Sequence, residues 1–224
     1  MKKQSVRTLS VLFLLVCFLF SGCSLFFNPQ EYLQASLDAI YKGKTSEYAE
    51  MVGISEYQAE QNYQQNYQSE VETFAKLYQI DPVSDAVKTR ICDLYQQLYS
   101  QVSYTVGDDI TKDGSYMVQL TVNPIELFVD VQPAVESYVK DFNNNAASGV
   151  YNEITAEEYM DIYANGLLDV FFANLPSVRY GDEIKLTIQI DHDSKNNTYS
   201  ISTQSLSDIA EAVIAYPTTV TKRG

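Results

Sequence analysis

Hydrophobic residues in the first half of the chain recur every three or four positions, the spacing of one helix face. Gly43 and Gly53 follow the first two periodic stretches, as helix-ending glycines do. Ser55 and Gln58 have the spacing of a capping box, and Asp81-Pro82 interrupts the pattern before a further stretch. The pattern predicts helices through residues 30–102, with these apolar positions: Leu33, Leu37, Ile40, Tyr41, Tyr63, Tyr67, Val71, Phe74, Tyr78, Val87, Ile91, Leu94, Leu98 and Val102.

The hydrophobic pattern then alternates residue by residue, which is typical of half-buried antiparallel strands. Turn residues at 107–109 and 112–114 accompany a first alternating region that includes Tyr104, Val106, Tyr116, Val118, Leu120 and Val122. A second region alternates through Ile184, Leu186, Ile188 and Ile190, and returns with Tyr199 and Ile201 after a turn predicted at 191–197. Each region predicts one β-hairpin.

Helical spacing separates and follows the two hairpins. It returns at 131–142, at about 156–174 after a capping box formed by Thr155 and Glu158, and at about 205–215. Gly166 lies in the middle of the second of these helices, where it predicts close packing. The order predicts an α+β fold: an antiparallel sheet of about four strands with helices on one face, preceded by an N-terminal helical region.

The first residues have the three parts of an export signal. Lys2, Lys3 and Arg7 precede an apolar run at 9–20, and the small residues Ser21-Gly22 come before Cys23. Leu19-Phe20-Ser21-Gly22-Cys23 resembles the signal of bacterial lipoproteins, with Phe20 where that family usually has Leu. The resemblance implies cleavage between Gly22 and Cys23, a diacylglyceryl group on Cys23, and attachment to the outer face of the cell membrane. An uncleaved transmembrane anchor is the alternative.

We therefore expect a signal peptide at 1–22, a lipidated tether at 23–29, a single α+β domain at 30–217 and a polar tail at 218–224. The domain divides into a helical part, 30–102, and a sheet-containing part, 103–217.

Loss of Lys2, Lys3 and Arg7 leaves 12 of the 15 basic residues against 29 acids, a net charge of −17. Such a surface repels nucleic acid and anionic headgroups. It favours solubility outside the cytoplasm, with recognition of a basic partner as the alternative.

Two segments resemble exported lipoproteins of Gram-positive bacteria that carry domains of unknown function. The opening Tyr32-Leu33-Gln34-Ala35-Ser36-Leu37-Asp38-Ala39-Ile40-Tyr41-Lys42-Gly43-Lys44 is similar to their first helix. The segment Asn196-Asn197-Thr198-Tyr199-Ser200-Ile201 is similar to their terminal strand, with Tyr199 where that group usually has Trp. The resemblance implies an NTF2-like or cystatin-like α+β fold and an envelope protein, and it implies no catalytic residues.

Motifs for catalysis and metal binding are weak. His192 is the single histidine and lies in a predicted turn, so we interpret it as solvated rather than catalytic. The acidic loop at 109–114 lacks the middle ligand and the terminal Glu of an EF-hand. Cys92 is the one cysteine left in the mature domain, and we expect a buried structural thiol. We predict no catalytic residue, no metal site and no cofactor.

Tyrosine pairs at helical spacing are the main candidates for a binding site. We favour ordinary core and helix–helix packing for such pairs, with a tyrosine-lined groove or pocket as the functional alternative. They are Tyr63 and Tyr67, Tyr95 and Tyr99, and Tyr159 and Tyr163. We expect a non-catalytic binding or interaction module with an envelope protein as partner. The alternatives are a carrier for a small molecule, glycan or peptide and, less favoured, an enzyme.

Overall fold

The computed structural model describes residues 27–112 and 114–220. Its order of elements is helices, hairpin, helices, hairpin, helix, as the pattern predicts. The elements are α1 (Pro29–Lys42), α2 (Thr45–Val52), α3 (Glu56–Tyr78), α4 (Asp85–Tyr99), β1 (Ser103–Lys112), β2 (Ser115–Asn123), α5 (Leu127–Asp130), α6 (Gln132–Ala147), α7 (Ala156–Asn174), the 3-10 helix η3 (Leu175–Ser177), β3 (Ile184–Asp193), β4 (Thr198–Ile201) and α8 (Thr203–Val213).

The two hairpins join into one antiparallel sheet of order β1-β2-β3-β4. Its centre is the pairing of β2 with β3, in which Val118 lies opposite Ile188 and Leu120 opposite Leu186. Because side chains alternate between the faces of a strand, this register gathers the apolar residues of both strands on one face. Gln119 and Thr187 occupy the other face, and the Gln119 amide donates to the Thr187 hydroxyl over 3.2 Å.

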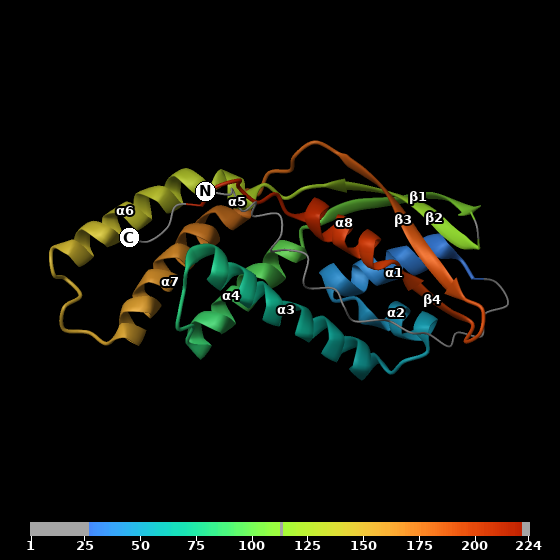
Figure 1. The fold of residues 1–224 in the computed structure, drawn as a ribbon, viewed down its shortest axis with the longest axis horizontal. Helices are drawn as coiled ribbons and strands as arrows, with labels where there is room; N and C mark the ends of the chain where they lie inside the picture. The colour runs from blue at the N-terminus through green and yellow to red at the C-terminus, as the bar shows by residue number, and fades with distance from the viewer. Residues whose placement is uncertain (1–26, 113, 221–224) are drawn as a thin grey trace, which may run out of the picture.

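Helices α1 and α8 cover the apolar face of this sheet (Figure 1). The contact with β1 includes a polar link, since the Tyr104 hydroxyl donates to Asp38 of α1 over 2.6 Å. The remaining helices extend the core away from the sheet, with α4 packed on both α3 and α7. Figure 1 shows the α6–α7 hairpin at one end of the long axis and the sheet at the other. The predicted α+β class, with its four-stranded sheet and N-terminal helices, is confirmed.

Local signals in the sequence account for several helix ends. Ser55 and Gln58 form a reciprocal capping box at the start of α3, and Thr155 and Glu158 do so at α7. Gly43 ends α1 in the left-handed conformation. Gly166 is closely packed, as predicted: an added Cβ would lie 2.2 Å from the Tyr138 hydroxyl of α6.

Two predicted turns are wrong. Residues 107–109 form an irregularity within β1, which continues to Lys112, because the register slips there between Val106 and Asp109. Strand β3 continues to Asp193, since Asp191, His192 and Asp193 pair with β4, so the second turn is shorter than predicted. Short polar residues are compatible with a bulge or a strand end as well as a turn, and cross-strand pairing decides between them.

The predicted signal peptide, Gly22, Cys23 and most of the tether lie outside the described residues. Among the helices of the described ranges, none combines the length and the apolar character needed to cross a membrane. The predicted domain limits and the single-domain organisation stay predictions, although one buried cluster includes residues from α1 through to Ile214.

Candidate functional site

The six candidate tyrosines fall into two separate groups. Tyr63 and Tyr67 of α3 meet Tyr99 and Tyr95 of α4, with ring centroids 5.1 Å apart for Tyr63–Tyr67, 6.2 Å for Tyr67–Tyr99 and 5.8 Å for Tyr95–Tyr99. The other two belong to α7 and surround Phe142 of α6, whose centroid is 4.9 Å from that of Tyr159 and 5.0 Å from that of Tyr163. The two groups therefore do not line one common pocket.

Most of these tyrosines are buried. Tyr63 and Tyr99 are each 8% exposed, and Tyr67, Tyr95 and Tyr163 are less so, whereas Tyr159 is half-buried. Their hydroxyls are engaged as well: Tyr67 donates to Tyr63, and Tyr163 donates to the Tyr78 carbonyl over 3.1 Å. Burial with satisfied polar tips is what core tyrosines require. Ligand binding by this set stays a prediction, and packing accounts for five of the six side chains.

A half-buried acid that the sequence did not single out lies beside the first group. The Tyr99 hydroxyl donates to Glu70 of α3 over 2.5 Å, and Tyr95 and Tyr216 share a hydrogen bond of 3.2 Å nearby. Loss of water around the carboxyl group raises the pKa of Glu70 to about 7, and the Tyr99 hydrogen bond opposes that rise. The sequence did contain a signal, because Glu70 follows Tyr67 by three positions and precedes Phe74 by four, on the aromatic face of α3.

The phenols around Glu70 remain protonated hydrogen-bond donors. Burial raises the pKa of Tyr95, Tyr99 and Tyr216 well above the ordinary value, and the carboxylate of Glu70 adds to each rise. Tyr41 shares this environment, with its ring centroid 5.2 Å from that of Tyr99, and its pKa is raised in the same way. We interpret this cluster as a polar part of the core, since none of its residues lines either of the two grooves described next.

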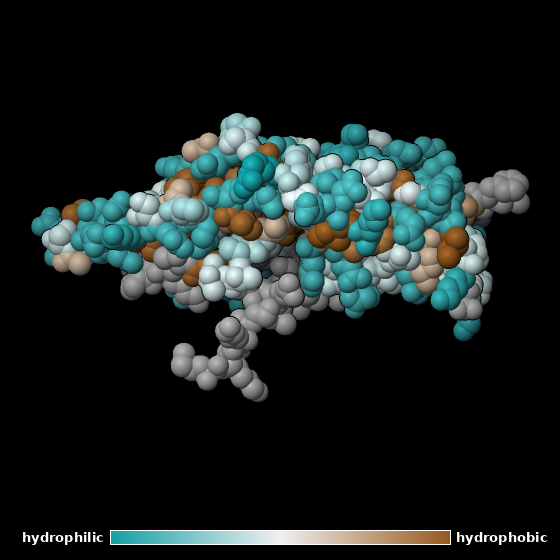
Figure 2. Space-filling view, turned by 90° about the horizontal axis from the view of Figure 1, so that it is seen from above, coloured by the Kyte–Doolittle hydropathy of each residue, from teal (hydrophilic) through white to brown (hydrophobic). Residues whose placement is uncertain are grey.

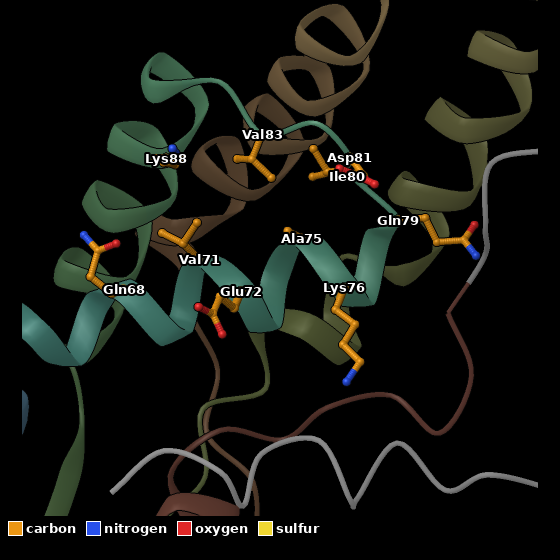
Figure 3. A pocket seen from close by; sticks show the side chains of 10 residues that line it. All are labelled: Gln68, Val71, Glu72, Ala75, Lys76, Gln79, Ile80, Asp81, Val83 and Lys88. Atoms are coloured by element: carbon orange, nitrogen blue, oxygen red, sulfur yellow. The ribbon is translucent and has the colours of Figure 1, made fainter. Parts of the chain in front are cut away.

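One open groove of about 810 Å³ lies between α3 and α4. Figure 3 shows Val71 and Ala75 of α3 facing Val83 and Ile80 of the connecting segment. The charged ends of Glu72 and Lys76 point away from this apolar area in the same view. Lys88 at its edge is paired with Asp85 over 2.8 Å. The groove is lined by charged residues of both signs, so it does not favour a particular ligand.

A second open groove of about 620 Å³ follows the α6–α7 hairpin. Aromatic residues of α6 and the connecting loop form one part of its lining, and the stacked rings of Phe142 and Tyr151 have centroids 4.9 Å apart. Carboxylates form another part: Asp141, Glu158, Asp161 and Asp169. In contrast to the α3–α4 groove, the charges that line this one have a single sign.

Gly166 and Tyr138 determine the wall of this second groove. The Tyr138 hydroxyl donates to the carbonyls of Ile162 and Tyr163 on α7, over 3.1 and 3.0 Å. Only glycine at position 166 leaves room for that ring, as the 2.2 Å approach of an added Cβ to the hydroxyl shows. The predicted close packing at Gly166 therefore positions a residue of the groove.

His192 lies near the end of β3, and Cys92 lies within α4. His192 stacks on Tyr199 with centroids 4.5 Å apart, and its Nε2 lies 3.1 Å from the Asn197 amide oxygen. Burial raises the pKa of the half-buried Cys92 thiol, and neighbouring Asp93 adds to the rise. Within the described part of the chain, no three His, Cys, Asp or Glu side chains are grouped as a metal site would require.

No protein-family model and no curated protein matches this sequence. A solved structure with a similar fold is described as a "putative lipoprotein (ycdA)" from Bacillus subtilis subsp. subtilis str. 168. The two share 14% sequence identity with a TM-score of 0.59, and the match covers 83% of this chain but 56% of that chain. This chain therefore corresponds to little more than half of the Bacillus protein, and the likeness is one of fold.

Proposed function

We propose that the protein is a lipoprotein, anchored through Cys23 to the outer face of the cell membrane, whose folded domain is a non-catalytic interaction module. The lipobox-like segment before Cys23 supports the anchor, and the description of the Bacillus structure is in keeping with it. The interaction role rests on one observation, the open α6–α7 groove with aromatic residues and carboxylates in its lining. The NTF2-like or cystatin-like class stays a prediction from the resemblance.

The position of Phe27 supports an orientation in which the groove is far from the membrane. The Phe27 ring stacks on Tyr199 of β4, with centroids 3.5 Å apart and planes within 1°, and also lies 5.4 Å from the Tyr32 ring. Cys23 precedes Phe27 by four positions, so an extended chain between them spans at most roughly 14 Å. The lipid would then lie near the sheet, at the end opposite the α6–α7 hairpin (Figure 1).

The carrier alternative is less favoured because most of the tyrosines it would need are in the core. A pocket for a small molecule requires side chains that reach open space. Five of the six tyrosines are at most 8% exposed, and Tyr95 and Tyr99 of α4 lie beside Glu70 instead of lining a pocket. We keep the proposal to an interaction module and assign it no catalytic step.

The anchor is tested by fractionating cells that produce the wild type or Cys23→Ser. Wild-type protein should remain with membranes and have a mass that fits a diacylated chain beginning at Cys23, since two acyl chains give stable attachment. The Cys23→Ser variant should appear in the soluble fraction. Equal, tight membrane association of both proteins would contradict lipid anchoring.

The interaction role is tested by placing a photo-cross-linking amino acid at Val150, between α6 and α7, in intact cells. Tyr57 at the start of α3 provides the control, because both side chains are exposed, at 61% and 73%. We expect a discrete cross-linked species from Val150 that is absent from Tyr57. Absence of cross-links at both positions, or the same species at both, would refute a specific interaction through the hairpin.

A further inference from the structure

The α6–α7 groove places aromatic rings beside carboxylates, which is the combination that recognises an arginine side chain. A guanidinium group stacks on aromatic faces and binds carboxylate oxygens through paired N–H donors. In the groove, the half-buried Tyr138 and Tyr151 provide the rings that a ligand can reach, while Phe142 is buried behind Tyr151. Asp141 on α6 and Asp161 on α7 provide carboxylates from its two helices.

The protein already binds one of its own arginines in this way on the same helix. Arg90 of α4 donates to Asp169 over 2.7 Å and to the Asn165 side-chain oxygen over 2.6 Å. Its guanidinium carbon lies 5.5 Å from the centre of the Phe172 ring. Arg90 therefore supplies the positive charge for Asp169, at one end of the α7 surface that lines the groove.

The rest of this surface has no such cation. Asp161, Asn165 and Asp169 follow one another at four-residue spacing on α7, and Arg90 reaches only the last two. Among the described residues that line the groove, none is Lys or Arg. The Asp161 Oδ1 atom is buried and has no hydrogen-bond partner in the described part of the chain. A buried acceptor without a partner is unfavourable. Asp161 as a whole is half-buried and lines the groove, so a donor from a bound molecule would stabilise its carboxylate group.

The groove also has apolar surface that a free cation would leave uncovered. Ile154 and Ile162 line it, and Ile162 is one of the exposed large hydrophobic residues. Figure 2 shows the narrow end of the molecule, formed by the α6–α7 hairpin, as mostly hydrophilic. Asp141, Asp161 and Asp169 line the groove together with the two isoleucines. Apolar contacts framed by charged residues are typical of protein interfaces.

We infer that the α6–α7 groove binds an arginine-containing basic segment of another extracytoplasmic protein. This inference rests on the proposed interaction role and specifies the chemistry of the partner. An arginine of that segment stacks on the groove aromatics and binds Asp161 and Asp141, while neighbouring apolar residues cover Ile154 and Ile162. The acidic surface of the whole domain attracts the basic segment, and the groove gives arginine its advantage over lysine.

The test uses the full lipidated chain, purified in detergent, and fluorescein-labelled peptides of repeating Arg-Gly-Ser, Lys-Gly-Ser and Gln-Gly-Ser. Fluorescence anisotropy at neutral pH measures the Kd of each peptide. The key variant combines Asp141→Asn with Asp161→Asn. The matched control combines Asp182→Asn with Glu183→Gln, which removes the same charge from exposed residues between η3 and β3.

We expect the arginine peptide to bind more tightly than the lysine peptide, and the glutamine peptide not to bind. The groove variant should weaken arginine-peptide binding about tenfold, because it removes the two carboxylates that bond to the guanidinium group. The control should weaken binding less than about twofold, because it reduces only the overall negative charge. Equal weakening by both double variants would overturn the inference in favour of general charge attraction. No binding of the arginine peptide at low salt would also overturn it.

Two further arms complete the test. If arginine methyl ester binds as tightly as the peptide, the inference of a protein segment as partner is overturned, and a small cationic ligand is indicated instead. If the Asp141–Asp161 double variant does not fold, Asp141→Asn alone, at an exposed position, should still weaken the arginine peptide more than the control does. A Val150 cross-link in cells without arginine selectivity in vitro would refute this inference and leave the proposed function standing.

Discussion

Replacement of Glu70 by glutamine tests whether the tyrosine cluster holds an uncharged acid. The Glu70 carboxyl group lies among Tyr41, Tyr95, Tyr99 and Tyr216, and its pKa in the folded protein is about 7 against 4.5 as the ordinary value. Glutamine keeps an oxygen that accepts the Tyr99 hydroxyl and removes the charge. The difference in the free energy of unfolding between the variant and the wild type therefore reports the cost of a charged carboxylate among the tyrosines.

The sign and size follow from the two pKa values. Below pH 4.5, Glu70 is protonated in both the folded and the unfolded protein, and the substitution should change stability little. Between pH 4.5 and 7, the unfolded chain releases the proton first, so the wild type loses stability as the pH rises. Above pH 7 the loss is complete, at about 3 kcal/mol for roughly 2.5 pKa units. Glu70→Gln should not show this loss.

Urea unfolding of wild type and Glu70→Gln, followed by circular dichroism from pH 4 to 9, measures the difference in the free energy of unfolding. Glu72→Gln is the control, since it makes the same substitution at an exposed position of the same helix and should change the free energy of unfolding by less than about 0.5 kcal/mol. A Glu70→Gln difference that stays within about 1 kcal/mol at every pH would refute the reasoning. It would mean that water reaches the carboxylate, or that the tyrosines rearrange around it.

Three further outcomes are expected from the contacts described above. Tyr99→Phe removes a hydrogen bond that lowers the pKa of Glu70, so that pKa should rise above 7. NMR of the Glu70 carboxyl carbon measures it, and a lower pKa in the variant would contradict the assigned hydrogen bond. Gly166→Ala should reduce the free energy of unfolding by about 1–3 kcal/mol in urea, despite a better helix propensity, because the Tyr138 ring must move. The same change in a Tyr138→Ala background should cost little, and an equal cost would refute that explanation. Phe27→Ala should lower stability by about 1 kcal/mol through loss of the Tyr199 stack, whereas an unchanged melting temperature would show that Phe27 does not hold the tether.

The sequence predicted those parts of the fold that depend on local chemistry. The capping boxes at Ser55 and Thr155 and the glycine at 43 require only nearby residues, and each appears where expected. The strand alternation placed Val118, Leu120 and Ile188 on one face because a strand with one buried face must sort its side chains in this way. The polar residues at 107–109 and 191–193 were misjudged, since pairing with the other strand of the same hairpin determines where the chain turns.

The candidate site was less predictable because it depends on which helix faces meet. Spacing alone identified Tyr159 and Tyr163 as one pair, yet it could not show that α6 supplies Phe142 and Tyr138 beside them. The aspartates of α7 look like ordinary surface charges in the sequence. Only the position of Arg90, brought from α4, separates Asp169, which has a cation, from Asp161, whose buried oxygen has no partner among the described residues.

The hydrogen-bonding needs of the tyrosine hydroxyl differ between the core and the groove. A tyrosine in the core needs a partner for its hydroxyl, and α3 and α4 meet that need with one another and with Glu70. The hydroxyls of this cluster bond to one another and to Glu70, and we expect the acid to make stability depend on pH. On the α6–α7 hairpin, Tyr138 bonds to backbone carbonyls instead, which leaves the carboxylates beside it free of that role. We therefore place the proposed recognition in the groove, where Tyr138 bonds to the backbone and leaves the neighbouring carboxylates without a bond from its hydroxyl.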